Sequence, residues 1–187
     1  MKPPLQILLD MDGVLADFFS HAFLGCRNAG LTQLTKEEYQ ETVAEFNMAA
    51  VFDISQEKFW STIDIGNFWE NLVAMPGALD LYDTLAVRYR VTIASSPSLN
   101  PECIPQKIRW LKKHDLTVTD CMFGSRKDLM ARPGNVLIDD YPGNVEKFRA
   151  AGGQAILVPS NWNTPGFDGS QAMTVVIEEL NKITYAL

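Results

Sequence analysis

The sequence has few of the residues that disulfide-rich, zinc-binding and membrane-spanning proteins need. Its three cysteines, Cys26, Cys103 and Cys121, form no close pair and no Cys-x-x-Cys motif, which is typical of free, mostly buried thiols in a reducing compartment. With only two histidines, no Cys/His cluster predicts a zinc site. No run approaches the ~20 apolar residues of a membrane-spanning helix, and the N-terminus lacks a signal-peptide segment. We therefore expect a soluble, cytoplasmic protein without a membrane partner.

Positive charge is also scarce, because 16 Lys and Arg residues stand against 23 Asp and Glu residues, a formal net charge of -7. Long nucleic acids bind to clustered Lys and Arg that displace counterions, so this balance disfavours a polynucleotide partner. It does not disfavour a small anionic substrate, because a bound cation can reverse the sign of the charge locally. The 187 residues, 47% of them hydrophobic, suffice for one core with a modest insertion.

The most informative stretch is residues 8–14 (LLDMDGV), close to the N-terminus. The apolar run that leads into it predicts a strand of a parallel sheet that is covered on both faces. Asp10 and Asp12 are two positions apart, so their side chains would point the same way from an extended chain. Two neighbouring carboxylates repel each other unless they face a cation or share a proton. The stretch therefore indicates a metal-dependent phosphoryl-transfer site.

Strand-like and helix-like segments alternate in the second half of the sequence. Strands are expected at 90–94, 135–138 and 154–158, with a short strand within 117–123, and segments of helix length separate them. After the first of these strands, the apolar residues at helical spacing are Ile104, Ile108 and Leu111. This alternation predicts an α/β fold, a parallel sheet with helices on both faces.

Residues 17–74, which we call the helical insertion, have a different character, because they are rich in aromatic residues and in helix-start signals. Thr35 is a candidate N-cap, with Glu38 three residues later to complete a capping box. Ser55 is a second candidate N-cap. A Met-Pro-Gly turn signal at 75–77 follows the insertion. We expect a small helical unit between the first strand and the rest of the sheet.

Reactive residues follow several of the expected strands. Ser95 and Ser96 come after the second strand, and Asp139 comes after a later one. Lys127 lies in the connection that precedes that later strand. Ligands of an open parallel sheet bind beyond the carboxyl ends of its strands, so we expect these residues to converge with Asp10 at one edge.

In their order along the chain, these residues resemble the four motifs of the haloacid dehalogenase (HAD)-like phosphatases. The longer stretch 10–18 (DMDGVLADF) resembles one branch of them, the 5'(3')-deoxyribonucleotidases, and the resemblance extends over residues 5–158. It implies a HAD-like Rossmannoid core made of residues 1–16 and 75–187. It also implies that residues 17–74 form a small helical cap inserted after the first strand.

The resemblance implies a role for each motif residue. Asp10 would be the nucleophile that forms an aspartyl-phosphate. Asp12 would protonate the leaving oxygen and then activate water. The groups that hold Mg2+ would be the Asp10 carboxylate, the Asp12 backbone carbonyl and Asp139. The phosphate-binding residues would be Gly13, Ser95, Ser96 and Lys127. The residues that orient these groups would be Asp140 and Asn144.

Three aromatic residues of the helical insertion are candidates for contact with a substrate base. In the resembling nucleotidases, aromatic rings surround the base. Phe18 matches one of these rings directly, and Trp60 and Phe68 match others approximately. Aromatic faces stack on nucleobases of every kind. The same rings also suit the insertion's own hydrophobic core. One residue departs from the family pattern, because Tyr141 follows the aspartate pair where related proteins commonly carry Arg.

The sequence therefore predicts a Mg2+-dependent phosphatase of the 5'-nucleotidase type that hydrolyses (deoxy)ribonucleoside monophosphates to nucleoside and phosphate. One alternative is a HAD phosphatase for another small phosphomonoester, such as a sugar phosphate. A second alternative is a catalytically silent relative that only binds a ligand. The base and sugar preference, the choice between 5' and 3' phosphates, the role of the C-terminal tail and the oligomeric state, a homodimer included, stay open.

Overall fold

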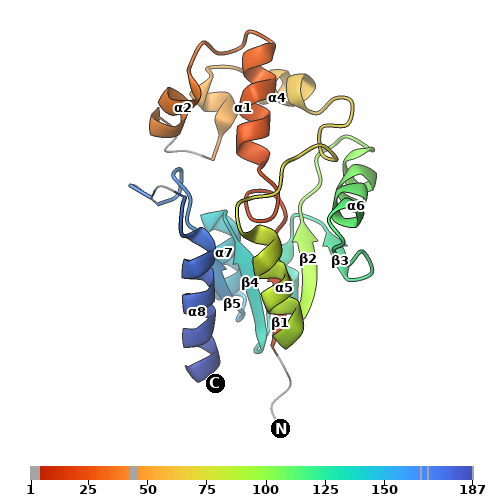
Figure 1. Cartoon of the computed structure of the whole chain (residues 1–187), viewed down its shortest axis with the longest axis vertical. Helices are drawn as coiled ribbons and strands as arrows, with labels where there is room; N and C mark the ends of the chain where they lie inside the picture. Colours follow the sequence, from red (N-terminus) through yellow and green to blue (C-terminus); the bar gives the residue numbers. More distant parts are fainter. Residues whose placement is uncertain (1–4, 43–45, 165, 168, 187) are drawn as a thin grey trace.

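The computed structural model describes residues 5–42, 46–164, 166–167 and 169–186. Within these ranges one parallel sheet has the strand order β3-β2-β1-β4-β5 (Figure 1). The strands are β1 (Gln6–Leu9), β2 (Arg90–Ser95), β3 (Cys121–Phe123), β4 (Asn135–Asp139) and β5 (Gln154–Leu157). The α/β architecture predicted from the alternating segments is confirmed.

The central strand β1 is apolar along its length because both faces of the sheet are covered. Ile7, Leu8 and Leu9 have no exposed surface, with Ile7 and Leu9 in the larger hydrophobic cluster and Leu8 in the smaller one. Successive side chains of a strand point to opposite faces, so a central parallel strand needs apolar residues at every position. Leu9 pairs with Ile93 of β2 and Ile138 of β4. The residues that follow these three strands therefore emerge at one edge.

The remaining core elements cover the two faces of the sheet. They are α5 (Ala78–Arg88), α6 (Cys103–Lys113), the 3-10 helix η1 (Lys127–Met130), α7 (Pro142–Ala150) and α8 (Ala172–Ala186). Figure 1 shows α5 and α8 in front of the sheet and α7 behind it. Accordingly, Leu85 of α5 and Val176 of α8 belong to the cluster of Ile7 and Leu9, whereas Phe148 of α7 belongs to that of Leu8.

The helical insertion lies beyond the edge of the sheet at which the strands end (Figure 1). Its helices are α1 (Phe18–Asn28), α2 (Lys36–Thr42), α3 (Met48–Val51) and α4 (Gln56–Ile63). Both predicted helix starts are confirmed. The Glu38 backbone N–H donates to Thr35 Oγ1 (3.1 Å) and the Thr35 N–H donates to Glu38 Oε2 (2.7 Å), while Ser55 Oγ accepts from the Lys58 N–H (3.1 Å).

One backbone bridge and contacts with α6 hold the insertion against the sheet. Ala16 and Ala74 form an antiparallel bridge, so the entering and leaving segments run side by side. In α6, Gln106 accepts from the Trp69 backbone N–H (3.0 Å), and Trp110 Nε1 donates to the Leu72 carbonyl (2.7 Å). These buried contacts fix the end of the insertion against α6. They therefore determine which side chains of the insertion face the ends of the strands.

α7 begins at Pro142, because proline is favoured at the first helical position, where its missing N–H costs nothing. One sequence expectation, the inward face of α6, differs in the structure. In α6 the buried side chains are Cys103, Gln106, Lys107, Trp110 and Leu111. The inward face of α6 is therefore rotated from the predicted one, and it includes two polar residues.

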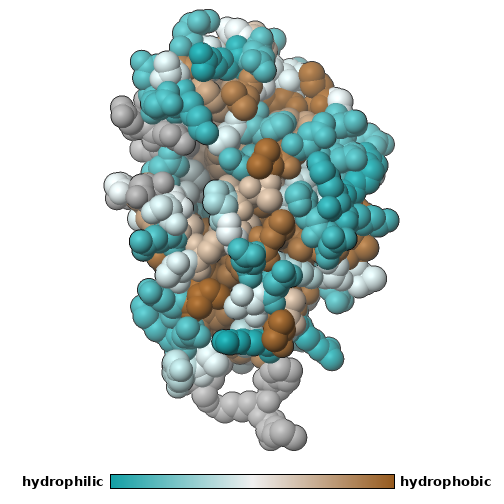
Figure 2. Space-filling model, viewed as in Figure 1, coloured by the Kyte–Doolittle hydropathy of each residue, from teal (hydrophilic) through white to brown (hydrophobic). Residues whose placement is uncertain are grey.

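The surface has no large apolar feature on the face in Figure 2, where hydrophobic and hydrophilic residues are interspersed. Exposed apolar side chains such as Val73 and Val87 are ordinary when scattered. Among the described residues, no helix is long and apolar enough to cross a membrane. Cys26, Cys103 and Cys121 are all free thiols, as predicted.

Candidate active site

A group of three buried carboxylates lies where β1 and β4 end. Asp10 follows β1, Asp139 is the last residue of β4, and Asp140 follows it. The Asp10 backbone N–H donates to the Ile138 carbonyl (2.9 Å), which extends the strand pairing to this point. One carboxylate oxygen from each aspartate lies within 4.8 Å of the other two, and exposures are 6%, 0% and 2%. The sheet therefore concentrates negative charge at a single point.

Lys127 supplies part of the balancing charge. It is the first residue of η1 and is 2% exposed, with Nζ 2.8 Å from Asp10 Oδ1 and 2.6 Å from Asp139 Oδ2. Burial lowers the pKa of this lysine, but attraction to Asp10 and Asp139 outweighs it, so the pKa lies above its usual value. Lys127 is therefore a permanent cation that bridges the two strand ends. The predicted convergence of Lys127 with both aspartates is present in the structure.

One lysine does not neutralise three carboxylates. Burial, together with the nearby Asp139 and Asp12 carboxylates, raises the pKa of Asp10 to about 7 against the opposing effect of Lys127. Burial also raises the pKa of Asp140 well above its usual value, and Asp140 Oδ2 has no hydrogen-bond partner among the described residues. A buried acceptor without a partner and excess negative charge are what a hard, oxygen-liganded cation would satisfy. The residues present fit Mg2+.

The loop after β1 requires glycine at position 13. Gly13 has φ +77°, and a Cβ placed there would lie 2.0 Å from Asp140 Oδ2. Any side chain would both strain the backbone and displace Asp140. Gly13, predicted as a phosphate-binding residue, thus brings the first loop into contact with the aspartate pair after β4.

The start of α7 orients Asp139. The Tyr141 backbone N–H donates to Asp139 Oδ1 (2.8 Å), and Asn144 Nδ2 donates to Asp139 Oδ2 (3.0 Å) and Oδ1 (3.3 Å). Asn144 therefore holds the carboxylate in place, as its predicted orienting role requires. Asp140, predicted to orient neighbouring groups, has a carboxylate oxygen within 4.8 Å of one oxygen each of Asp10 and Asp139.

A functional residue that the sequence reasoning missed is Lys107 of α6. Its side chain is completely buried, and Nζ donates to Asp12 Oδ2, to Ser95 Oγ (2.8 Å) and to the Ser96 carbonyl (3.0 Å). Nζ also lies 4.4 Å from the centre of the Trp69 ring, a cation–π contact. Lysine is rarely fully buried without a partner. No sequence signal identifies Lys107, because the burial of this position depends on how α6 is rotated against the sheet.

The two serines after β2 have different surroundings. Ser95 is buried, and its hydroxyl accepts from Lys107 and donates to Asp12 Oδ2 (3.4 Å). Ser96 lines the cavity described below, as do Asp10 and Asp12. Ser95 therefore contacts the Asp12 carboxylate, and Ser96 lies at the cavity wall.

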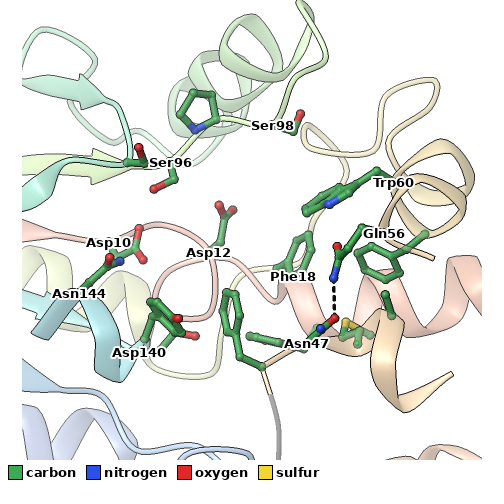
Figure 3. Close-up of a pocket in the computed structure, with 18 of the residues that line it drawn as sticks. Asp10, Asp12, Phe18, Asn47, Gln56, Trp60, Ser96, Ser98, Asp140 and Asn144 are labelled. Carbon is green, nitrogen blue, oxygen red and sulfur yellow. Dashed lines mark hydrogen bonds between the residues drawn. The ribbon is translucent and has the colours of Figure 1, made fainter. Parts of the chain in front are cut away.

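A cavity of about 560 Å3 opens above the carboxylates, within the size range of small-molecule sites. Figure 3 shows Asp10, Asp140 and Asn144 at one end, Asp12 in the middle and Trp60 at the other end. The aromatic rings that line it are Phe18, Phe19, Phe46, Phe59, Trp60 and Trp69, together with Tyr141. The carboxylates of Asp10, Asp12 and Asp140 and an aromatic wall thus line one space.

Phe18 and Trp60 line the cavity, whereas Phe68 has a different position. Phe18 stacks on Trp69, with 5.6 Å between ring centres and 15° between planes, and lies 6.1 Å from Trp60. Phe68 is 8% exposed and packs edge-on against Phe18 (5.9 Å) and Trp69 (5.1 Å). Of the three predicted base contacts, two therefore line the cavity, and Phe68 packs against the Phe18 ring outside the cavity lining.

Tyr141, the residue that departs from the family pattern, connects the core to the insertion. Its ring lies 4.5 Å from that of Phe46, and Phe46 lies 5.2 Å from Trp162 and 5.7 Å from Phe19. An arginine here would place a charge among these rings. In this chain, the position instead closes one side of the cavity with an aromatic contact.

Similarity to known proteins agrees with this geometry. Residues 4–172 match the family described as 5' nucleotidase, deoxy (pyrimidine), cytosolic type C protein. A Bordetella pertussis protein, provisionally named a 5'(3')-deoxyribonucleotidase, is 31% identical over 144 residues, which are 74% of this chain and 75% of that protein. The human cytosolic-type 5'(3')-deoxyribonucleotidase is 31% identical over 124 residues, which are 61% of this chain and 59% of that protein.

Solved structures share the fold at low sequence identity. A haloacid dehalogenase-like family hydrolase from Streptococcus pneumoniae gives a TM-score of 0.61 at 14% identity, with 100% of both chains covered. A HAD hydrolase from Bacillus subtilis, solved bound to magnesium, gives 0.55 at 15% identity and covers 88% of this chain and 91% of that chain. The HAD-like fold and the family match agree, so the chain belongs to this 5'-nucleotidase family and is a phosphoric monoester hydrolase of the 5'(3')-deoxyribonucleotidase type.

Proposed function

We propose that this protein is a Mg2+-dependent phosphatase that hydrolyses (deoxy)ribonucleoside monophosphates to nucleoside and phosphate through an aspartyl-phosphate intermediate. One observation carries the proposal: a single cavity has Asp10 and Asp12 at its polar end and the rings of Phe18 and Trp60 at its other end (Figure 3). A phosphate monoester with a flat, apolar base matches this division. A sugar phosphate would leave the aromatic wall without a partner.

In the first half of the reaction, an Asp10 carboxylate oxygen attacks phosphorus while the bond from phosphorus to the ester oxygen breaks. Asp12 gives its proton to that leaving oxygen. The surroundings of Asp12 suit this role, because Lys107 and Ser95 hold Oδ2 while Oδ1 has no hydrogen-bond partner among the described residues. One oxygen is thus anchored and the other is free for the substrate.

In the second half, a water molecule attacks the phosphorus of the aspartyl-phosphate and the bond to the Asp10 oxygen breaks. Asp12, now a carboxylate, accepts the proton of that water, so phosphate leaves and both aspartates return to their initial states. Lys127 stays against Asp10 and Asp139 throughout and stabilises negative charge on the phosphate oxygens.

Mg2+ would be held by Asp10, Asp139, Asp140 and the Asp12 backbone carbonyl. When bound, it supplies the positive charge that relieves repulsion between the Asp10 carboxylate and the phosphate. The acidic group and the raised pKa values of Asp10 and Asp140 support this assignment. We also propose that the helical insertion acts as the cap that selects the leaving group, and that the protein acts in the cytoplasm.

The proposal is tested by measuring phosphate release from 5'- and 3'-(deoxy)nucleoside monophosphates and from small sugar phosphates, with Mg2+ and with a chelator. We expect release that needs Mg2+ and is fastest with deoxynucleotides. Release that is fastest from a sugar phosphate would remove the nucleotide assignment and keep the chemistry. No release from any substrate would favour a silent ligand-binding relative.

A further inference from the structure

Two polar side chains, Asn47 and Gln56, interrupt the aromatic end of the cavity. Both line it, and Gln56 Nε2 donates a hydrogen bond to Asn47 Oδ1 (2.6 Å; Figure 3). Asn47 precedes α3 and Gln56 is the first residue of α4. They lie at the opposite end of the cavity from Asp10, on the same side as Trp60 (Figure 3).

The hydrogen bonds determine which way each amide points. Asn47 is the N-cap of α3, and its Oδ1 accepts from the Ala50 backbone N–H (3.3 Å) as well as from Gln56. An N-cap needs an acceptor at this position, so the Oδ1 and Nδ2 atoms of Asn47 are not interchangeable. Because Gln56 donates through Nε2, its Oε1 is directed elsewhere. Among the described residues, the amide atoms of the pair that take no part in these hydrogen bonds are the donor Asn47 Nδ2 and the acceptor Gln56 Oε1.

A donor beside an acceptor is complementary to the edge of a nucleobase. In each base, a ring nitrogen lies next to an exocyclic oxygen or amino group, so that a donor and an acceptor are adjacent. The rings of Phe18 and Trp60 offer faces for the flat surface of the same base. A sugar phosphate or another base-free phosphomonoester would satisfy neither the rings nor the amides.

We propose that Asn47 and Gln56 are specificity-determining residues that hydrogen-bond the edge of the substrate's nucleobase. Asn47 Nδ2 donates to the base, and Gln56 Oε1 accepts from it. The inference rests on the proposed nucleotidase function and adds to it a pair of side chains that select for the base. A site built to hydrogen-bond a substrate discriminates strongly against analogues that lack the partner groups.

The decisive variant is Asn47→Asp. Aspartate is a good N-cap and keeps an oxygen for both Ala50 and Gln56, so it retains the contacts within the protein. It replaces only the N–H donor that faces the base with an acceptor. We would measure kcat/KM for deoxyuridine 5'-monophosphate and for deoxyribose 5-phosphate, which is the same molecule without its base. The ratio of the two values reports selection for the base.

We expect Asn47→Asp to lower this ratio about tenfold or more. Gln56→Met, which removes the acceptor but keeps the length of the side chain, should lower it as well. The negative charge that Asn47→Asp adds acts on the phosphate of both substrates alike, so this effect cancels in the ratio. Asn71→Asp is the matched control, because Asn71 is an exposed amide of the same insertion that is not part of the cavity wall.

Two results would overturn the inference, and they differ from each other. If the wild-type protein hydrolyses deoxyuridine 5'-monophosphate well and both variants keep the wild-type ratio, the amides do not read the base, while the proposed function stands. If the wild-type protein hydrolyses deoxyribose 5-phosphate as well as the nucleotide, the proposed function fails together with the inference. A lower ratio in both variants, with an unchanged ratio in Asn71→Asp, supports the inference.

Discussion

The carboxylate edge and the aromatic wall of the cavity are built in opposite ways. At the edge, Asp10, Lys127 and Asp139 are at most 6% exposed, and each is held by an ion pair at the end of a strand. At the wall, Phe46 is 46% exposed and Trp60 is 37% exposed, and both come from the short-helix insertion. Reacting groups need fixed geometry, whereas a wall that receives a base tolerates looser packing. In the proposed function, the buried edge carries the chemistry and the more exposed part of the wall takes part in recognition.

Lys107 connects the two regions. It contacts Asp12 and Ser95 at the edge and the Trp69 ring at the wall. A change at Lys107 should therefore affect the rate of the reaction. Changes confined to one region should affect either the rate of the reaction, at the edge, or the preference for nucleotides, at the wall. The predictions below test that separation.

The largest effect is expected for Asp10→Asn. Asparagine has the shape of aspartate but cannot form the aspartyl-phosphate, so turnover should fall about 10^4-fold or more. The fold should survive, because Lys127 keeps its partner Asp139. Phosphate release and a thermal melt check both statements. Asp120→Asn, the same change at an exposed carboxylate, should have no effect, and normal turnover by Asp10→Asn would refute the nucleophile assignment.

Lys107→Met should lower kcat/KM for a nucleoside monophosphate about 10^2-fold, because the Asp12 carboxylate loses the cation that anchors it. The loss should be smaller with p-nitrophenyl phosphate, whose leaving group needs little protonation. Lys112→Met, at an exposed position of the same helix, serves as the control. Equal losses with both substrates would indicate that Lys107 supports the structure and not the proton transfer.

The carboxylate edge should bind Mg2+ in competition with protons. The pKa of Asp10 is raised to about 7, and that of Asp140 is raised as well. Below about pH 7, Mg2+ must therefore displace protons in order to bind. The affinity for Mg2+ should then fall about tenfold per pH unit for each proton displaced. Without metal, the raised pKa of Asp10 stabilises the fold below about pH 4, the usual carboxyl pKa, and this contribution is lost as the pH rises through about 7. The contribution of Asp140, whose pKa is also raised, is likewise lost as the pH rises.

The increase in Tm caused by saturating Mg2+ should therefore grow between about pH 5.5 and 8. Thermal melts with Mg2+ and with a chelator across this range provide the measurement. An increase that does not depend on pH would show that the metal binds without displacing protons from the group of Asp10, Asp139 and Asp140.

Trp60→Ala should lower kcat/KM for nucleotides about tenfold, the order of one base–aromatic stacking contact. It should change the value for deoxyribose 5-phosphate much less, because Trp60 lies at the end of the cavity away from Asp10 (Figure 3). Equal losses with both substrates would mean that the wall also positions the phosphate, and the separation between the two regions would fail.

The smallest effect is expected for Phe68→Leu. This ring is buried against Phe18 and Trp69, so shortening it should lower the free energy of unfolding by about 1 kcal/mol. The preference for nucleotides over deoxyribose 5-phosphate should stay close to the wild-type value. A denaturant melt and the same pair of kcat/KM values test this, and a large loss of preference would return Phe68 to the set of base contacts.

The sequence by itself determined the sheet and the residues at its edge. Strand periodicity and apolar runs predict β1, β2 and β4, and parallel strands bring the residues that follow them to one edge. Asp10, Asp139 and Lys127 could therefore be grouped before any coordinates were known. Local signals were sufficient for helix starts too, since the capping box at Thr35 involves only neighbouring residues.

Only the tertiary structure decided which side chains complete the site. Lys107 reaches Asp12 because α6 turns its polar residues inward, and Phe46 rather than Phe68 lines the cavity because of how the insertion packs on the core. Asn47 and Gln56 face the same space only when α3 and α4 meet. Contacts between helices and loops depend on the rotation and packing of whole elements, which hydrophobic periodicity constrains weakly, whereas strand ends are aligned by backbone hydrogen bonds.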